Sequence, residues 1–399
     1  MKNTFLTLAI ASTLFISCGE DDTADIIINN TDNSTTINNN GDTTDPSNPT
    51  DETVYISGTY VEDLELTSEK TYILNGALVM TDGTTLTIEE GTQINALASG
   101  SDIYIAISQG AKIEANGTAA NPIVMTSNST APKAGDWGGL ILLGKAPINS
   151  VATGTSTSEI GSLPYGGTDE ADNSGTLRYV RVQYSGGKAD GSSENNGFSF
   201  YGVGNGTTVE YIQMYEGLDD GLEFFGGTVN VNYVSVINAQ DDSIDWTEGF
   251  SGKVTNAYVQ HGADHDKAFE CDGYNTDIGN NSNPIFWSAP EVTNVTVVSA
   301  NDASEAIRLR AGTQGVFTNI VLNDFAEGFD LDGDTDGNNP TGQGVLDGVL
   351  KVVDVTFNNV TTKLKNDTGF TFTEAEFISG DGNATGTDYA TWGADWTVE

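Results

Sequence analysis

The sequence is poor in cysteine, histidine, proline and positive charge, and these shortages exclude several classes of protein. Its 399 residues include 2 Cys, 2 His, 9 Pro and 15 Lys plus Arg, against 57 Asp plus Glu. Two cysteines cannot build a disulfide framework. A formal net charge of −42 disfavours contact with nucleic-acid phosphates or acidic membrane surfaces. The partners expected from charge are therefore cations, and no nucleic acid.

Residues 1–17 have the pattern of a lipoprotein signal peptide. Lys2 precedes a 12-residue, mainly apolar stretch from Phe5 to Ile16, and Ser17 stands directly before Cys18. Spanning a bilayer takes about 20 residues, so we expect cleavage and no transmembrane span in the mature protein. The order Phe-Ile-Ser-Cys resembles a bacterial lipobox, which implies that Cys18 is acylated and held in outer-membrane lipid. The alternative is an ordinary signal peptide with an incidental cysteine.

Residues 18–53 are predicted to be a flexible acidic tether. They are rich in Asn, Thr, Asp and Ser and contain too few apolar residues to repay the entropy of ordering. The stretch Gly19-Glu20-Asp21-Asp22 resembles the acidic surface-export signal of Bacteroidetes lipoproteins. That resemblance implies an outer-membrane protein that faces the extracellular side.

After the tether, short β-branched runs alternate apolar and polar residues between Gly, Asn and Asp, as half-buried strands do. The second half contains a repeat of apolar-polar-apolar triplets, whose starts are 24, 22, 25, 38 and 22 residues apart. The triplets are Phe198-Ser-Phe200, Leu222-Glu-Phe224, Ile244-Asp-Trp246, Phe269-Glu-Cys271, Ile307-Arg-Leu309 and Phe329-Asp-Leu331. A companion strand starts at Val209, Val231, Val254, Val292, Val316 and Val352.

This period predicts an all-β fold, a parallel β-helix in which equivalent residues stack from coil to coil. We expect the β-helix at 54–368, with about 11 coils, and a C-terminal cap at 369–399. The two longest intervals predict insertions at 273–290 and 332–350. Asn256, Asn294 and Asn319 should form a ladder of amide hydrogen bonds, and Cys271 should be a buried strand residue. A β-sandwich or a propeller is the main rival fold.

Several further segments resemble a known family of surface lipoproteins of Bacteroidetes and relatives that form a right-handed parallel β-helix of pectate-lyase-like architecture. They include residues 83–94 and 117–123, Gly135-Asp-Trp-Gly-Gly139, residues 144–149, 165–167 and 174–181, and Asp219-Asp-Gly-Leu-Glu223. The likeness covers about residues 55 to 335. It implies the handedness of the coil and a location at the cell surface. It implies no catalytic residue, because no activity of the family transfers to particular positions.

Stacking of the triplets predicts two charged columns. The middle residues of the triplets are Glu223, Asp245, Glu270, Arg308 and Asp330, and two positions before each triplet lie Asp220, Asp242, Lys267, Glu305 and Glu327. Carboxylates one strand spacing apart repel each other. We therefore expect Lys267 and Arg308 to act as counter-charges and Ca²⁺ to bind this acidic face. The alternative is a solvated face with splayed side chains.

A second candidate calcium site lies in the sequence Asp332-Gly-Asp334-Thr-Asp336-Gly-Asn338. Carboxylates at alternate positions can surround one Ca²⁺ ion, and Gly337 permits the turn. The twelfth position is Gln343 rather than Glu, so an EF-hand is not expected. The metal ligands predicted here are Asp332, Asp334, Asp336 and Asn338.

Signals for catalysis are weaker. The pairs Asp219-Asp220 and Asp241-Asp242 resemble the acid pairs of β-helical pectin hydrolases, with His261 and Arg308-Leu-Arg310 as accompaniments, but that family's neighbouring motif residues are absent. His261 and His265 could hold zinc on a helix, whereas a strand followed by a turn predicts exposed histidines. The sequence therefore predicts a non-catalytic binding or structural role that includes contact with glycans. The alternative is a polysaccharide lyase or a glycoside hydrolase.

Overall fold

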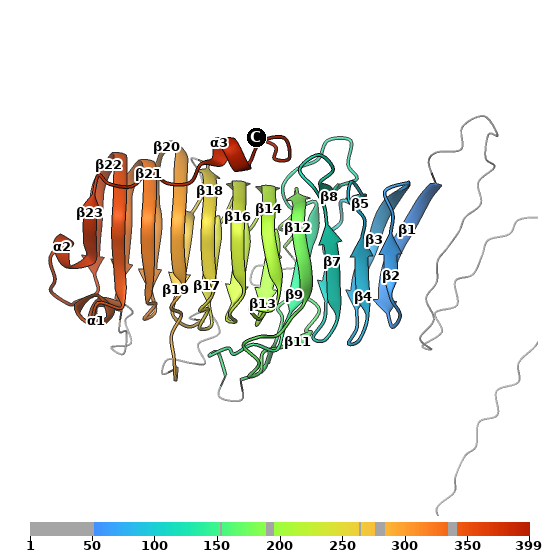
Figure 1. Cartoon of the computed structure of the whole chain (residues 1–399), viewed down its shortest axis with the longest axis horizontal. Helices are drawn as coiled ribbons and strands as arrows, with labels where there is room; N and C mark the ends of the chain where they lie inside the picture. Colours follow the sequence, from blue (N-terminus) through green and yellow to red (C-terminus); the bar gives the residue numbers. More distant parts are fainter. Residues whose placement is uncertain (1–51, 152–153, 189–194, 263–264, 276–283, 334–340) are drawn as a thin grey trace, which may run out of the picture. The chain divides into compact units, whose positions relative to one another are not determined.

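A computed structural model describes residues 52–151, 154–188, 195–262, 265–275, 284–333 and 341–399. These residues form a parallel β-helix in which each strand pairs with the strand one coil further along the chain (Figure 1). The predicted all-β class is confirmed, since only three short helices occur in the described residues. None of these helices is long and apolar enough to cross a membrane.

The strands lie on three faces. The first face contains β2 (Leu64–Leu66), β4 (Thr85–Ile88), β7 (Lys112–Asn116) and the first halves of β12 (Gly175–Gln183), β14 (Thr208–Gly217), β16 (Asn230–Ala239) and β18 (Lys253–His261). The second face contains the first halves of β1 (Glu52–Tyr60) and β3 (Lys70–Met80), then β5 (Gln93–Ala96), β8 (Ile123–Ser127) and the second halves of β12 to β18.

The third face carries the candidate site. It contains the second halves of β1 and β3, then β6 (Gly100–Ile107), β9 (Trp137–Leu143), β13 (Phe198–Tyr201), β15 (Leu222–Phe225), β17 (Ile244–Thr247) and β19 (Lys267–Asp272). The long strands β20 (Glu291–Arg310), β21 (Gly315–Asp332) and β22 (Leu350–Asp367) run through all three faces. β10 (Ser156–Thr157) and β11 (Pro164–Tyr165) form a separate antiparallel hairpin.

The residues after β22 contribute to both the coil and its covering. β23 (Ile378–Asp381) pairs with β22 in parallel, inside the segment expected as a cap. α1 (Thr341–Leu346) lies between β21 and β22, within the predicted insertion at 332–350, and α2 (Glu374–Phe377) precedes β23. α3 (Tyr389–Trp392) belongs to a C-terminal segment that runs back over β20, β18, β16 and β14 (Figure 1).

The register of the triplets is the one that the repeat predicts. Phe198 pairs in turn with Leu222, Ile244, Phe269, Ile307 and Phe329, and all six side chains are buried. The rings of Phe200 and Phe224 stack with centroids 5.1 Å apart. One companion position is wrong by a residue, because Phe317 rather than Val316 pairs with Val292 and is buried. Apolar side chains thus line the inside of the coil, and the alternating residues point outward.

The corner between the first and second faces needs a left-handed backbone conformation in coil after coil. The residues with positive φ there are Tyr179, Tyr211, Tyr233, Asn256, Asn294, Asn319 and Asp354. Asn and Asp tolerate this conformation, whereas Tyr does not favour it. The three tyrosine rings stack with centroids 4.4 and 4.3 Å apart, a contact that offsets the cost.

Candidate functional site

The two charged columns lie on the third face, in the order that the repeat predicts. Glu223 pairs with Asp245, Asp245 with Glu270, Glu270 with Arg308, and Arg308 with Asp330. In the second column, Lys267 pairs with Glu305 and Glu305 with Glu327. The chain therefore stacks acidic residues from β15 to β21.

Several members of these columns are buried. Asp220, Asp242 and Asp330 are 7%, 5% and 2% exposed. The main-chain N–H of Asp242 donates to Asp220 Oδ1 at 2.9 Å, and that of Lys267 donates to Asp242 Oδ1 at 2.7 Å. Asp220 and Asp242 are therefore not splayed into solvent, because they turn along the stack to accept N–H groups of the next coil, whereas Glu223, Asp245 and Glu327 are half-buried.

Lys267 is the central base of the second column. Its Nζ lies 2.9 Å from Glu270 Oε1, 2.5 Å from Asp266 Oδ2 and 3.9 Å from Asp242 Oδ1. Burial opposes the charge of the ammonium, but the carboxylates of Asp242 and Glu270 outweigh burial and raise the pKa of Lys267 above its ordinary value. Lys267 therefore stays charged and neutralises the middle of the column.

Arg308 has a different partner from the one that its position in the column suggests. Its Nε donates to Asp332 Oδ2 at 2.7 Å, and its Nη1 lies 4.0 Å from Glu270 Oε1. Asp330, its neighbour in register, is bound instead by Lys365, with 2.9 Å between Nζ and Oδ2. Arg308 still compensates the column, but by way of Glu270 and Asp332.

Two counter-charges were not predicted. Arg310 donates from Nε to Asp272 Oδ1 at 2.6 Å and from Nη2 to Glu270 Oε2 at 2.5 Å. Lys365 pairs with Asp330 in the next coil. The alternation of strand residues could have revealed Arg310, which lies two positions after Arg308 and shares its outward direction.

At the β15–β17 end of the columns, three described carboxylates form no salt bridge with Lys or Arg. One carboxylate oxygen each of Asp220, Glu223 and Asp245 lies within 4.8 Å of the others, and among the described residues no Lys or Arg forms a salt bridge with the three. Asn196 Nδ2 donates to Glu223 Oε2 at 2.7 Å, while Asp245 Oδ1 is buried and accepts no hydrogen bond. Burial, followed by repulsion between neighbouring carboxylates, raises the pKa of all three well above the usual range.

This arrangement allows two kinds of chemistry. A carboxyl group with a raised pKa can stay protonated near neutral pH and serve as a general acid. Alternatively, three oxygens within 4.8 Å suit a hard cation that takes only oxygen ligands. In four further groups of three carboxylates the oxygens also lie within 4.8 Å of one another, namely Asp219/Asp220/Asp241, Asp241/Asp242/Asp266, Glu305/Glu327/Asp330 and Asp330/Asp332/Asp367.

Two predicted sites fall wholly or mainly outside the described residues. The predicted lipid attachment site, Cys18, lies outside them. Of the predicted calcium loop, Asp334, Asp336 and Asn338 also lie outside them. Asp332, the first ligand predicted in that loop, lies at the end of β21 and is bound by Arg308. The Asp-rich loop and the lipid attachment therefore stay predictions.

The structure corrects the expectation for the histidines. His261 ends strand β18, as the strand prediction requires, but its side chain is fully buried against Phe325 and 3.4 Å from Ser243 Oγ. Burial, followed by the neighbouring His265, lowers the pKa of His261 to about 4. The prediction of an exposed His261 is wrong, because His261 continues the inward alternation of Ala257 and Val259 on β18.

The prediction for Cys271 is confirmed. Its side chain is fully buried in the inward column between Trp246 and Leu309. Burial raises the pKa of the thiol well above its usual value. A thiol without solvent access and without thiolate character is unsuited to nucleophilic catalysis.

Near β6 and β9 the third face carries apolar rather than charged side chains. Tyr104, Ile141, Tyr201 and other apolar residues form a second cluster outside the coil, packed against residues of the β10–β11 hairpin. Behind this cluster Glu248 is 1% exposed and accepts hydrogen bonds from Tyr165 Oη at 2.8 Å and Ser150 Oγ at 2.9 Å. The repeat did not reveal Glu248, because its partners lie 83 and 98 residues away in sequence.

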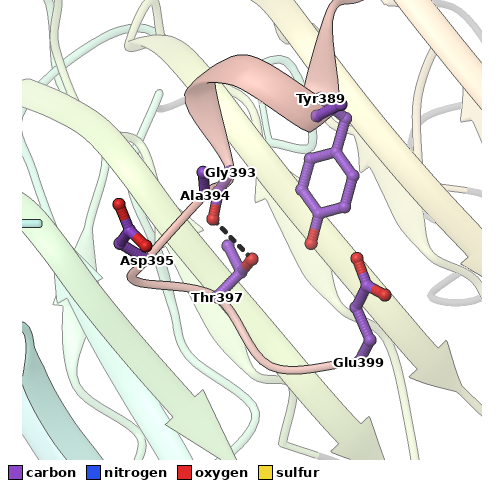
Figure 2. Close-up of a pocket in the computed structure, with 7 residues that line it drawn as sticks. Tyr389, Gly393, Ala394, Asp395, Thr397 and Glu399 are labelled. Carbon is purple, nitrogen blue, oxygen red and sulfur yellow. Dashed lines mark hydrogen bonds between the residues drawn. The ribbon is translucent and has the colours of Figure 1, made fainter.

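A small pocket lies at the C-terminal segment, away from the acidic columns. It has a volume of about 210 Å³ and is lined by Tyr389, Ala390, Gly393, Ala394, Asp395, Thr397 and Glu399. Figure 2 shows that all labelled residues come from α3 and the chain after it, with Thr397 Oγ1 donating to the Gly393 carbonyl at 2.7 Å. The pocket brings together no cluster of carboxylates or bases, so the candidate site remains on the third face.

Comparison with known proteins gives one distant structural neighbour and one family. The catalytic unit of a thermostable GH87 α-1,3-glucanase from Streptomyces thermodiastaticus shares 9% sequence identity, with a TM-score of 0.37 over 85% of this chain and 64% of the glucanase chain. This chain thus spans less than two thirds of that neighbour. No curated protein matches the sequence. Residues 58–397 match the family described as the pectate-lyase-like β-helix domain, and the chain belongs to that family.

Proposed function

We propose that the protein is a lipid-anchored, non-catalytic binding or structural protein of the bacterial cell surface, whose acidic columns hold Ca²⁺. The observation that carries the cation proposal is the convergence of Asp220, which is buried, with the half-buried Glu223 and Asp245: one oxygen of each lies within 4.8 Å of the others, and the three form no salt bridge to Lys or Arg in the described residues. Buried like charges need a counter-charge or a proton. Ca²⁺ fits, because it takes carboxylate oxygens in irregular geometry.

The geometry favours binding over catalysis. Asp220 and Asp242 are 7% and 5% exposed, so they offer a polysaccharide little surface. Their oxygens already accept main-chain N–H groups from the stack. Contact with glycans remains part of the proposal, but not at Tyr179, Tyr211 and Tyr233, because these rings stack on one another and contact the C-terminal segment.

The proposed location depends on the N-terminal pattern. Acylated Cys18 would anchor the chain in the outer membrane, and residues 18–53 would hold a right-handed coil of about 11 turns away from the lipid. Detergent-phase partition of the full-length chain in a Gram-negative host tests the anchor. We expect the wild-type chain in the detergent phase and the Cys18→Ser variant in the aqueous phase. Equal partition of both chains would overturn the anchor.

Thermal unfolding of the full-length protein tests the cation proposal. We expect a higher Tm in Ca²⁺ than in EDTA, because an ion that binds only the folded state stabilises it. Mg²⁺ at the same concentration controls for ionic strength and should have a smaller effect. An unchanged midpoint in EDTA would remove the cation from the proposal.

A glycoside hydrolase or lyase is the second candidate function. It is favoured by the raised pKa of Glu223 and Asp245, which suits a general acid, and by Arg308 on the same face. Product release from neutral and acidic polysaccharides should be measured for the wild type and for Asp245→Asn and Arg308→Ala. Activity in the wild type that both substitutions abolish would establish the enzyme and overturn the non-catalytic proposal. No release by the wild type would remove this candidate.

A further inference from the structure

Three carboxylates converge at the β20–β21 end of the acidic columns. Glu305 lies on β20, while Glu327 and Asp330 lie on β21. Glu305 and Glu327 are directly paired in the sheet, and Asp330 follows Glu327 by three residues. One oxygen of each side chain lies within 4.8 Å of one oxygen of each of the others. The stack thus brings three acidic oxygens to one point.

The oxygens at this point lack hydrogen-bond donors. Glu305 Oε2, Glu327 Oε2 and Asp330 Oδ1 are all buried, and none accepts a hydrogen bond. The side chain of Asp330 is 2% exposed, so water cannot readily reach its Oδ1. Buried carboxylate oxygens normally have donors, because an unpaired one loses its hydration without replacement. Three such oxygens in one cluster indicate a ligand that none of the side chains supplies.

The nearby bases do not neutralise the cluster. Lys365 Nζ lies 2.9 Å from Asp330 Oδ2 and 3.6 Å from Glu327 Oε2, but it is also 3.5 Å from Asp367 Oδ2. Arg308 is directed to Asp332, and Lys267 is held by Asp266 and Glu270. The ammonium of Lys365 is shared by Glu327, Asp330 and Asp367, while Glu305 forms no salt bridge in the described residues, so the cluster keeps an excess of negative charge.

We propose that Glu305, Glu327 and Asp330 bind one divalent cation of the hard, oxygen-seeking class, with Ca²⁺ as the best fit. Ca²⁺ takes about six to eight oxygen ligands in flexible geometry, whereas Mg²⁺ demands a near-ideal octahedron and keeps several waters, so three carboxylates held by neighbouring strands suit Ca²⁺ better. The three oxygens, each within 4.8 Å of the others, lie close enough together to share one ion. A divalent cation also offsets the excess negative charge of the cluster. This site deepens the proposed cation binding and depends on it, but it lies at other residues.

The test uses the full-length chain, stripped with EDTA and then dialysed against Ca²⁺ alone. Bound metal per chain is measured by mass spectrometry for the wild type, Glu327→Gln and the control Glu291→Gln. Glu291 lies on β20 too, but its side chain is 62% exposed and pairs with Lys253 on the first face. We expect the control to equal the wild type and Glu327→Gln to bind one ion fewer.

Unfolding of the same proteins gives a second readout. In EDTA, Glu327→Gln should have a higher Tm than the wild type, because it removes an uncompensated buried charge. In Ca²⁺ the wild type should have the higher Tm, because it binds one more stabilising ion than Glu327→Gln. If Glu327→Gln fails to fold, Glu305→Gln serves the same purpose, since it removes the charge from the neighbouring coil.

The outcomes separate this site from the broader proposal. If Glu327→Gln binds as many ions as the wild type, the assignment to this cluster is overturned, while Ca²⁺ binding elsewhere on the columns stands. If the wild type binds no Ca²⁺, both proposals fail. If the variant loses one ion but is the less stable protein in both EDTA and Ca²⁺, its loss of metal reflects structural damage, and the site is likewise overturned.

Discussion

Asn294 donates an amide hydrogen bond to Asn256 one coil earlier, with 3.0 Å between Nδ2 and Oδ1. Asn319 continues the series by donating to Asn294 Oδ1 at 2.8 Å. All three residues have positive φ at the corner of the coil. The ladder predicted from the sequence is therefore confirmed, and it serves two purposes, since Asn fits the left-handed turn and links neighbouring coils.

Substitution of Asn294 separates these two purposes. Asn294→Gly keeps the left-handed turn and loses the amide bonds, so we expect a loss of about 1–2 kcal/mol in the free energy of unfolding. Asn294→Ala also forces a residue with a Cβ into positive φ, which adds about 1 kcal/mol. Denaturant titration measures both variants. Equal losses for Gly and Ala would show that the conformation carries no cost.

His261 should make the protein less stable in mild acid. Its pKa is lowered to about 4 by burial, followed by His265, so below the ordinary value near 6.5 the unfolded chain takes up the proton first. Stability attributable to His261 is thus complete above pH 6.5 and falls, by up to about 3 kcal/mol, as the pH drops to 4. Denaturant titrations of the wild type and His261→Gln between pH 4 and 7 measure this difference. A difference independent of pH would contradict the prediction.

Arg310 should matter more for stability than an exposed base does. Removing it by Arg310→Gln leaves Glu270 and Asp272 without their guanidinium, and their side chains are 13% and 6% exposed. We expect a loss of about 3 kcal/mol. The matched control is Lys253→Gln, which breaks an exposed pair with Glu291 and should cost less than about 1 kcal/mol. Similar Tm values for the two variants would show that the charges on the third face are not coupled.

Cys271 should react with a maleimide only when the coil opens. The thiol is fully buried, and burial raises its pKa, so the native state offers no thiolate to the reagent. Labelling of the Cys18→Ser chain, in which Cys271 is the remaining cysteine, should follow global unfolding across a denaturant series. Fast labelling in buffer would indicate local opening of β19.

The sequence predicted the coil well because each coil repeats the same physical requirement. Inward residues such as Phe224 and Trp246 must stack on the preceding coil, and that need produces a visible period. The companion position failed only at Val316, which pairs with Glu291, while the next residue, Phe317, takes the inward position beside Val292. Register and column order were therefore predictable from local pattern alone.

Side-chain partners were less predictable than register. Arg308 was expected between Glu270 and Asp330, and the strand pairing agrees. Its long side chain, however, donates to Asp332 rather than to Asp330. Glu248 was missed because Tyr165 and Ser150 reach it from insertions that have no period. The burial of His261 could have been predicted from the alternation of β18, in which Ala257, Val259 and His261 share the inward direction.

The C-terminal segment changes how a coil of this kind should come apart. In a solenoid each repeat touches only its neighbours, so it can unravel from one end. Here Asn319, Thr296, Ser235, Gln213 and Arg181, which lie on five different strands, bond in turn to Gly386, Thr387, Tyr389, Val398 and Trp396. The last residues of the chain thereby tie strands β12 to β21 together, and we expect this part of the molecule to melt as one cooperative unit.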